Sequence, residues 1–355
     1  MAIEIVPYLP AHGAAVRRFH ERLAAVGADP DMRFPEPSDS GWMPGTQLWL
    51  AVEGDEVRGG YILRRQTFSF GGETHQVAHY RLPLSEGLVN RAYAPLAVRL
   101  VREALNREAQ LYALGMGGWE KPLPEMLKRL NWRMAAVPLY FKAPHPYRFL
   151  RQIRALRSSA FGRLACDAAA FSGAGWLALW LAGVARRTSG PAPLEAPASF
   201  AGWADAVWER CRTRYAMAAV RDAATLDRLY PPSDPRFLRV RAAGGWAVLL
   251  DTAMHGHKQF GDLRVGTIVD SLAPPEDAAV VVLAAARTLE ERGVDLIVSN
   301  QLHHAWSSAL PKAGFRQAPT NFLIAISPVL AARIEGRADL EIHMNRGDGD
   351  GPIHL

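Results

Sequence analysis

The sequence of 355 residues suggests two domains, because most domains contain about 100–200 residues. Hydrophobic residues make up 49% of the chain and charged residues 21%, which excludes general disorder. The formal net charge of +6 is too small to indicate a nucleic-acid-binding protein. Two cysteines, Cys166 and Cys211, exclude a disulfide scaffold and a Cys-rich zinc site, and they indicate a reducing compartment. The chain does not open on a basic flank and an apolar stretch, so we expect no signal peptide.

The first part of the chain alternates predicted strands and helices. Apolar runs predict the strands, and apolar residues that recur every three or four positions predict the helices. In chain order we expect strands at Leu48–Val52, Gly60–Leu63 and Gln76–Leu82, a helix at Pro95–Asn106, a strand at Gln110–Leu114, a helix at Leu123–Leu130 and a strand at Ala136–Phe141. These elements predict a first domain over residues 1–145.

A helical connector is predicted over residues 146–198, between two proline-rich breaks. Pro144 and Pro146 close the last strand of the first domain. At the other end, the prolines of Thr188–Pro197 exclude both helix and sheet.

The second part of the chain repeats the order of elements of the first. Its predicted elements are strands at Trp246–Leu250 and Val265–Val269, a helix at Glu276–Arg292, a strand at Val294–Val298, a helix at 303–312 and a strand at Asn321–Ile326. They predict a second domain over residues 199–335, followed by a loop-like tail at 336–355.

The ends of two corresponding helices strengthen the repeat. Asn131 and Gly314 close these helices, and both residue types tolerate a left-handed cap. An aromatic residue follows each, Trp132 and Phe315, and can fold back on the core. The sequence therefore predicts a duplicated α/β unit.

This unit resembles the GNAT acyltransferase fold. Asn300, Ala305 and the run Lys312–Phe315 look like the C-terminal Asn…Ala…Lys-x-Gly-Phe signature of that family. Two such units in one chain are similar to the Fem-type peptidoglycan aminoacyltransferases and to acyltransferases of envelope-polysaccharide clusters. The resemblance implies an α/β (α+β) fold of two tandem mixed-sheet domains, with acyl-coenzyme A as co-substrate.

The family binds the pyrophosphate of coenzyme A in a glycine-rich loop before the long helix, where backbone N–H groups and the helix dipole attract phosphate. The equivalent stretch here is Leu84–Pro95, which has a leading arginine but alanine in place of the first glycine. The second unit has two acids at the same place, which would repel phosphate, so we assign the carrier site to the first unit. The predicted carrier-binding residues are Gly87, Arg91, Ala92, Ala94, Gly115 and Gly117.

Acyl transfer to an amine needs a base for the ammonium proton and an acid for the leaving thiolate. Glu86 is the first candidate for the base, with His79 as the alternative base and Tyr80 as the candidate acid. The alternative is that Glu86 caps a turn and Tyr80 packs in the core.

Substrate binding is assigned to four residues. Trp119 and Glu120 follow the glycine-rich loop Gly115–Gly118 and could stack on and pair with a positive group. The alternative for this loop is a tight turn with a packed tryptophan. Asp270 and Asn300 occupy strand ends of the second unit, and Asp270 could instead cap the helix that follows.

The connector carries arginines at 148, 151, 154 and 157, and 18 uncharged residues run from Ala168 to Ala185. A helical hairpin that packs between the domains is the favoured interpretation. The alternative is a basic amphipathic element on an anionic membrane surface. True membrane spanning is disfavoured, because the stretch is rich in alanine and glycine and has arginines at both ends.

The sequence thus predicts an N-acyltransferase that moves an acyl group from a coenzyme A thioester to an amine. An amino sugar or other cell-envelope precursor, small or lipid-linked, is the expected acceptor. No histidine or acid spacing predicts a metal site. An aminoacyl-tRNA donor and a non-catalytic scaffold or binding subunit are the alternatives. The expected location is the cytoplasm. If the connector binds lipid, the expected position is the inner face of the membrane.

Overall fold

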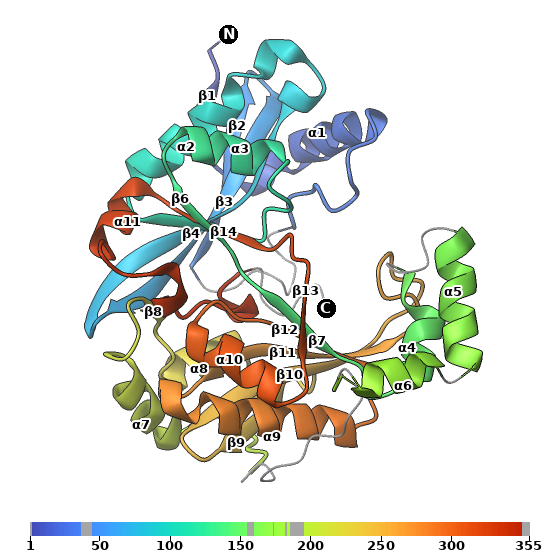
Figure 1. Cartoon of the computed structure of the whole chain (residues 1–355). Helices are drawn as coiled ribbons and strands as arrows, with labels where there is room; N and C mark the ends of the chain where they lie inside the picture. Colours follow the sequence, from blue (N-terminus) through green and yellow to red (C-terminus); the bar gives the residue numbers. More distant parts are fainter. Residues whose placement is uncertain are drawn as a thin grey trace. The chain divides into compact units, whose positions relative to one another are not determined.

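The computed structural model describes residues 2–36, 45–154, 160–172, 174–181, 183–184 and 195–349. The chain forms two compact units (Figure 1). Unit 1 contains Met1–Phe68, Thr74–Ala135 and Leu323–Glu335, and unit 2 contains Ser69–Glu73, Ala136–Phe322 and Gly336–Leu355. Each unit has a mixed sheet of its own with helices packed on it, which confirms the predicted α/β class with two tandem mixed sheets.

The sheet of unit 1 is covered by helices on both faces. Its strand order is β1 (Glu4–Pro7), β2 (Thr46–Glu53), β3 (Glu56–Phe70), β4 (Glu73–Ser85), β5 (Leu111–Leu114), β14 (Leu323–Ile326) and β6 (Arg133–Ala136). Helices α2 (Leu96–Arg107) and α3 (Pro122–Arg129) share one apolar core with Tyr61, Tyr80 and Ala325. Helix α1 (Gly13–Ala25) packs with Leu50 and Ile62 in a second core. The short helix α11 (Pro328–Arg333) follows β14.

The sheet of unit 2 also lies between helices. Its strand order is β13 (Arg316–Ala318), β7 (Leu139–Lys142), β12 (Leu296–Asn300), β11 (Arg264–Leu272), β10 (Gly245–Ala253) and β9 (Leu238–Ala242). Successive residues of β10 point to opposite faces, as in any strand. Ala247 and Leu249 pack against α9 (Ala278–Glu291) and α10 (His304–Lys312), whereas Trp246 and Val248 pack against α7 (Gly202–Cys211) and α8 (Ala223–Leu229).

Each half of the sequence contributes its last strand to the sheet that is formed mainly by the other half. Strand β7 comes from the first half of the sequence but pairs with β12 and β13 in unit 2. Strand β14 comes from the second half but lies between β5 and β6 in unit 1. The predicted single strand at Ala136–Phe141 is therefore wrong: it is two strands in different sheets, β6 and β7. Pro138 separates them, because proline cannot donate a ladder hydrogen bond.

The corresponding helix ends match in geometry, which confirms that part of the predicted repeat. Asn131 has φ 59° and Gly314 has φ 84°, both left-handed. The backbone N–H of Trp132 donates to Leu127 O at 3.1 Å, and the backbone N–H of Phe315 donates to Leu310 O at 3.1 Å. Both aromatic side chains are buried in the cores under these helices.

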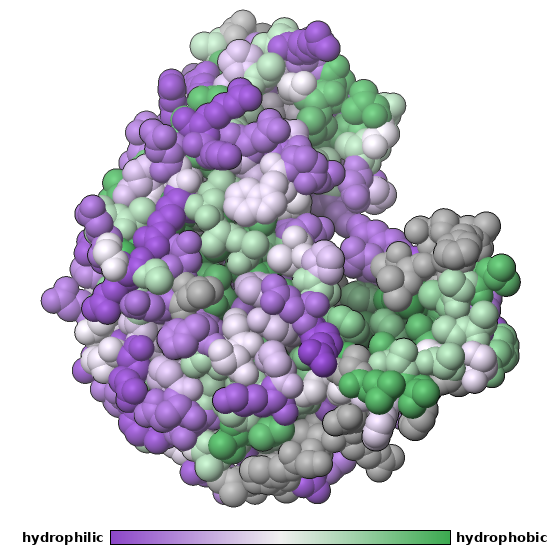
Figure 2. All heavy atoms as spheres, in the orientation of Figure 1, coloured by the Kyte–Doolittle hydropathy of each residue, from purple (hydrophilic) through white to green (hydrophobic). Residues whose placement is uncertain are grey.

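The connector belongs to unit 2, and its described residues form the helices α4 (Pro146–Gln152), α5 (Ala160–Phe171) and α6 (Ala174–Leu181). Their inner side chains share a core with Val265, Leu296 and Val298 of the unit 2 sheet. Apolar surface gathers over the outer side of these helices (Figure 2). Among the described residues, no helix combines the length and apolarity needed to cross a membrane. Most of the predicted break at Thr188–Pro197 lies outside the described residues.

The described part of the C-terminal segment contains two 3-10 turns, at Asp339–Glu341 and Arg346–Asp348, and is built into unit 2. Met217 bridges to Ile342, and Gln301 bridges to Asn345. The 3-10 turn at Arg346–Asp348 is buried against β11. Residues 350–355 of the predicted tail lie outside the described residues.

Candidate functional site

Strands β4 and β5 of unit 1 pair over a short distance and then separate. Their parallel register links Ala78 with Leu111 and His79 with Tyr112. Past this point β4 continues to Ser85, while the remaining residues of β5 pair with β14 on the other side. Beyond His79 and Tyr112 the two strands share no further register pair among the described residues, and backbone groups between separated strands need other partners. The parting point is therefore the geometric centre of the candidate site.

His79 lies at the last paired position and is fully buried. Its ring stacks on Tyr112 with centroids 4.7 Å apart and an interplanar angle of 6°. Among the described residues, neither ring nitrogen of His79 makes a hydrogen bond of normal geometry, and the backbone of Leu114 is the polar group that acts most directly on the ring. Burial, with the positive charges of Arg64 and Arg81, holds the pKa of His79 well below its usual value. The imidazole is therefore neutral at physiological pH, with one donor and one acceptor nitrogen unused.

Tyr80 points to the opposite face of β4, into the core beneath α2. Its ring lies 5.4 Å from that of Tyr61, centroid to centroid, and its hydroxyl has no hydrogen-bond partner. Burial raises the pKa of Tyr80 well above its usual value. The side chain thus remains a phenol that can donate a hydrogen bond.

Glu86 is held by two arginines. Its carboxylate accepts from Arg22 Nε at 2.7 Å and from Arg58 Nη1 at 3.0 Å, and only 4% of the residue is exposed. Arg22 also bonds Glu56 and the carbonyl of Val57, so this network ties α1 and β3 to the turn after β4. Abstraction of a proton by Glu86 would require at least one guanidinium to move. Its role as a base stays a prediction.

Two short turns lead from β4 into α2, and each is closed by a side chain. Ser85 Oγ accepts from Gly87 N at 3.1 Å, and Asn90 Oδ1 accepts from Ala92 N at 3.0 Å. A Cβ on Gly87 would lie 3.0 Å from Ala94 Cα, so the close approach of the two turns requires glycine there. Gly87 therefore shapes the predicted carrier loop.

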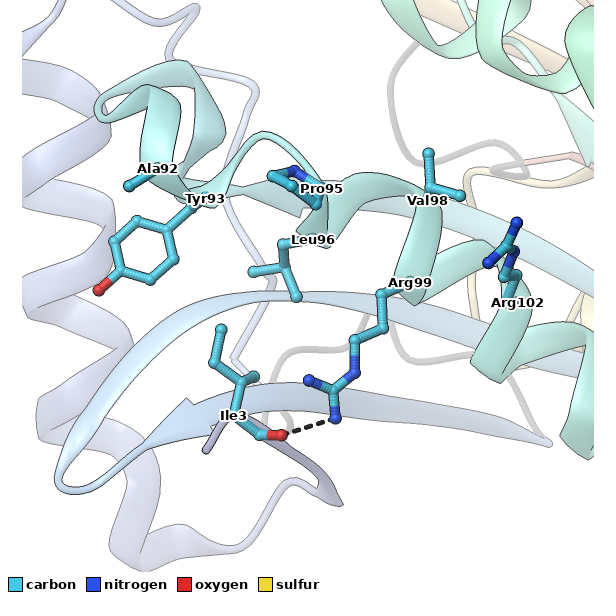
Figure 3. A pocket seen from close by; sticks show the side chains of 8 residues that line it. All are labelled: Ile3, Ala92, Tyr93, Pro95, Leu96, Val98, Arg99 and Arg102. Carbon is cyan, nitrogen blue, oxygen red and sulfur yellow. Dashed lines mark hydrogen bonds between the residues drawn. The ribbon is translucent and has the colours of Figure 1, made fainter. Parts of the chain in front are cut away.

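An open groove of about 600 Å³ borders this loop (Figure 3). Its lining residues are Ile3, Ala92, Tyr93, Pro95, Leu96, Val98, Arg99 and Arg102. The side chain of Leu96 turns into the core and is 3% exposed, so it does not block the loop. Arg99 donates to Ile3 O at 2.6 Å, and Arg102 is exposed in the groove.

The groove region has the character of an anion site. In the described part of the chain, the N–H groups of Leu96, Ala97 and Val98 at the start of α2 have no backbone acceptor. Such groups and the helix dipole attract phosphate. Arg91 is exposed on the adjacent turn and adds positive charge, as do Arg99 and Arg102.

The glycine loop after β5 carries the predicted acceptor contacts. Gly115 and Gly117 have φ values of 76° and 83°, which favour glycine. Gly115 N donates to Leu323 O at 2.9 Å, so the exchanged strand β14 anchors the loop. Trp119 is 48% exposed and Glu120 is also exposed. Both side chains are accessible to a ligand, and their role stays a prediction.

The equivalent parting of strands in unit 2 is filled by the protein itself. Strands β11 and β12 pair from Val265–Leu296 to Ile268–Ser299, and Asp270 lies just beyond. The Asp270 carboxylate accepts from Arg221 Nε at 2.7 Å, and from Asn345 Nδ2 in the C-terminal segment at 2.9 Å.

A buried charge triad completes this closure. Arg221 Nη2 donates to Asp348 at 2.5 Å, and the Tyr230 hydroxyl donates to Asp270 at 2.7 Å. Burial opposes ionisation of Asp270, but Arg221 and the hydrogen bonds from Tyr230 and Asn345 outweigh it and lower its pKa. Burial raises the pKa of Asp348, which Arg221 offsets only in part. The segment that carries Asp348 thus occupies the gap beside β11.

Asn300 lies in the same closed region. Its side chain donates to Pro138 O and accepts from Arg346, both at 3.5 Å. Every bond recorded for Asp270 and Asn300 is internal to unit 2, and their predicted substrate contacts stay predictions.

The structure therefore places most predicted site residues in unit 1, on β4, the turns before α2 and the loop after β5, and places Asp270 and Asn300 in unit 2. Sequence reasoning missed Tyr112, which stacks on His79, and the pair Arg99 and Arg102. The arginines had a readable signal: they are three residues apart on the predicted long helix, directly after the carrier loop.

No protein-family model and no curated protein matches the sequence. Solved structures do match the fold. A conserved protein of unknown function from Enterococcus faecalis V583, described as a probable N-acyltransferase, aligns with TM-score 0.50 and 9% identity, covering 92% of this chain and 72% of that one. Saccharomyces cerevisiae N-myristoyltransferase with bound myristoyl-CoA and inhibitors aligns with TM-score 0.50 and 8% identity, covering 96% and 86%. The chain shares its fold with these two proteins, in the tandem form that the resemblance read from the sequence implied.

Proposed function

We propose that this protein is an N-acyltransferase that binds an acyl-coenzyme A thioester in unit 1. One observation carries the proposal: the turn between β4 and α2 borders a groove with exposed Arg99 and Arg102, and among the described residues the first N–H groups of α2 have no backbone acceptor. The fold supports it, because the yeast structure with the same fold is described with bound myristoyl-CoA. In unit 2 the corresponding gap is filled by Asn345 and Asp348, which supports a single carrier site.

The groups of unit 1 suit the parts of such a donor. The first turn of α2, with Arg91 and Arg102, would hold the phosphates by hydrogen bonds and charge. The parted strands would bond the amide-containing arm along their free backbone edges. In the reaction the amine nitrogen attacks the thioester carbonyl carbon, the carbon–sulfur bond breaks, and the thiolate takes a proton. Neutral His79 and phenolic Tyr80 are the buried groups near the parting point that could accept or donate that proton.

The acceptor in this proposal is an amine. An amino sugar or other cell-envelope precursor is the proposed class, and it rests on the resemblance to envelope enzymes alone. Exposed Trp119 and Glu120 support an acceptor with a positive group and a stacking surface.

Binding of acyl-CoA tests the proposal directly. We expect acetyl-CoA or a longer acyl-CoA to bind in calorimetry and to raise the melting temperature. Ala94→Asp should weaken this binding about ten-fold, because a carboxylate beside the phosphates costs about 1 kcal/mol per charge pair. The variant should keep its stability, since an acid before a helix N-terminus is favourable.

A matched control is available at another helix start. Ala201 is the exposed N-cap residue of α7 in unit 2, so Ala201→Asp adds the same charge at the same kind of position. It should leave acyl-CoA binding unchanged. If no acyl-CoA binds at saturating concentration, the thioester donor is refuted. Binding of aminoacyl-tRNA would then support the Fem-type alternative, and its absence would support a scaffold.

A further inference from the structure

The connector helices expose large apolar side chains on their outer side. Among the described residues, five of the eleven exposed large apolar side chains lie on α5 and α6 (Figure 2). They are Leu164 at 69% exposed, Phe171 at 67%, Leu177 at 48%, Trp180 at 38% and Leu181 at 62%. The spacing is helical, with Leu164 and Phe171 seven residues apart and Leu177 and Leu181 four apart, so each helix presents one apolar stripe. We call these five side chains the apolar face.

The opposite side of the same helices is already used. Ala170 and Leu179 pack in the core that holds the connector on the unit 2 sheet. A Cβ on Gly175 would lie 2.4 Å from Leu150 Cδ1, so α6 is pressed closely onto α4. The helices therefore have an inner face fixed on the sheet and an outer apolar face whose five side chains are 38–69% exposed. Exposed apolar patches of this kind mark interaction sites.

Arginine outnumbers acid in the sequence of the connector, although Arg148 also lies 3.4 Å from the carboxylate of Asp295. Arg148 is 61% exposed at its side chain, and the Arg151 guanidinium lies 4.8 Å above the Phe171 ring. The single acid between Arg148 and Arg187 is Asp167, and it pairs with Arg151 at 3.5 Å. Seven arginines fall in that stretch, so it carries the whole net charge of the protein. Arg157, Arg186 and Arg187 lie outside the described residues.

We propose that the apolar face docks on an anionic lipid surface. The apolar side chains would enter the boundary between headgroups and acyl chains, with Trp180 at the interface, while the arginines contact lipid phosphates. Helices α5 and α6 contain 12 and 8 residues, below the roughly 20 needed to span, so they would lie in the surface. Each arginine close to an anionic surface adds about five-fold in affinity.

Charge favours an anionic lipid surface over a second copy of the chain as the partner of the apolar face. A two-fold contact would bring each apolar face against itself, and arginine would then meet arginine. Like charges across an interface oppose association. An anionic lipid surface instead offers opposite charge to the arginines and an apolar layer to the five side chains.

Vesicle co-sedimentation of the full chain tests the proposal. We expect binding to phosphatidylcholine vesicles that contain 30% phosphatidylglycerol, and at least ten-fold weaker binding to pure phosphatidylcholine or at 1 M salt. Leu177→Glu with Leu181→Glu should abolish binding, because both side chains are exposed and their replacement leaves the core intact. The control is Val329→Glu, which alters a 50% exposed apolar side chain on α11 of unit 1 and should bind normally.

Three results would overturn the proposal: no binding to anionic vesicles, equal binding to neutral ones, or unchanged binding by the double variant. A concentration-dependent dimer that the double variant abolishes would assign the apolar face to a second copy. Acyl-CoA binding by the double variant should equal that of the parent, so this test and that of the proposed acyl transfer fail independently.

Discussion

Replacement of Arg221 by methionine tests whether the charge triad holds the C-terminal segment in unit 2. Arg221 is 2% exposed and bonds two carboxylates, Asp270 and Asp348, which have no exposed surface. Arg221→Met keeps much of the side-chain volume and removes the guanidinium that bonds both carboxylates. Two uncompensated buried acids then remain.

The cost should be large. Removal of one partner from a buried ion pair costs about 3–5 kcal/mol, because the remaining charge stays desolvated. With two carboxylates left, we expect the upper end of that range, about 5 kcal/mol. That is a large part of the 5–15 kcal/mol typical of folded domains. A triple variant that also carries Asp270→Asn and Asp348→Asn should recover most of the loss, since no buried charge remains.

The sign of the pH dependence gives a second readout. Without Arg221, burial raises the folded-state pKa of the pair above the unfolded value of about 3.9. The folded variant therefore takes up a proton as the pH falls from 8 to 5, whereas the unfolded chain does not. By linkage, the deficit in unfolding free energy relative to the parent should shrink as the pH falls through this range.

Urea unfolding at several pH values measures both effects, and hydrogen exchange locates them. Peptides that cover β11 and Arg346–Asp348 should lose protection in Arg221→Met, while peptides from α2 in unit 1 should not. A cost below 1 kcal/mol, or a deficit that is the same at pH 8 and pH 5, would refute the reasoning.

Three further substitutions give sharp outcomes. Lys142 lies on strand β7, and its buried Nζ is 2.6 Å from the carboxylate of Glu290 on α9. Lys142→Met should therefore lower the unfolding free energy by about 3 kcal/mol in urea titrations. If adding Glu290→Gln does not reduce that loss, the buried ion pair is not its cause. Glu86→Gln should lower the melting temperature through its two arginine bonds but leave the rate of acyl transfer within a few-fold, and a drop of two orders of magnitude would instead establish Glu86 as the base. His79→Phe should keep the stack on Tyr112, raise the melting temperature by about 2–4 °C because two unsatisfied nitrogens disappear, and reduce acyl transfer. Unchanged turnover of His79→Phe would remove His79 from the site.

Much of the fold could be predicted from the sequence, because apolar periodicity and helix caps depend on residues that are close together in the chain. Apolar periodicity located β2, β4, α2 and β12 closely, and the Asn131 and Gly314 caps identified the repeat. The first helix, α1, was not predicted, although Val16, Phe19 and Leu23 bury one face of it.

The strand exchange could not be read from the sequence. Both halves have a similar order of elements, so the apolar pattern of Leu323–Ile326 is compatible with a strand in either sheet. Only the path of the chain decides which sheet it enters, and apolar patterning does not encode that path.

The candidate site was predictable as a region and less so in its chemistry. The loop at Arg91–Ala94 does lie beside a basic groove at the start of α2. The environment of Glu86 was not predictable, because Arg22 and Arg58 are 64 and 28 residues away in sequence. The closure around Asp270 was equally hidden, since it depends on Asp348 at the far end of the chain.

The exchange of β14 constrains how the protein can be made. In unit 1, β14 lies between β5 and β6, so β6 has no neighbour in the sheet until residue 326 has been synthesised. A nascent chain that ends at residue 145 holds nearly all of unit 1 and still lacks this strand. Completion of unit 1 must therefore wait until residue 326 has left the ribosome, and the incomplete sheet edge is the stretch that a chaperone would have to shield in the meantime.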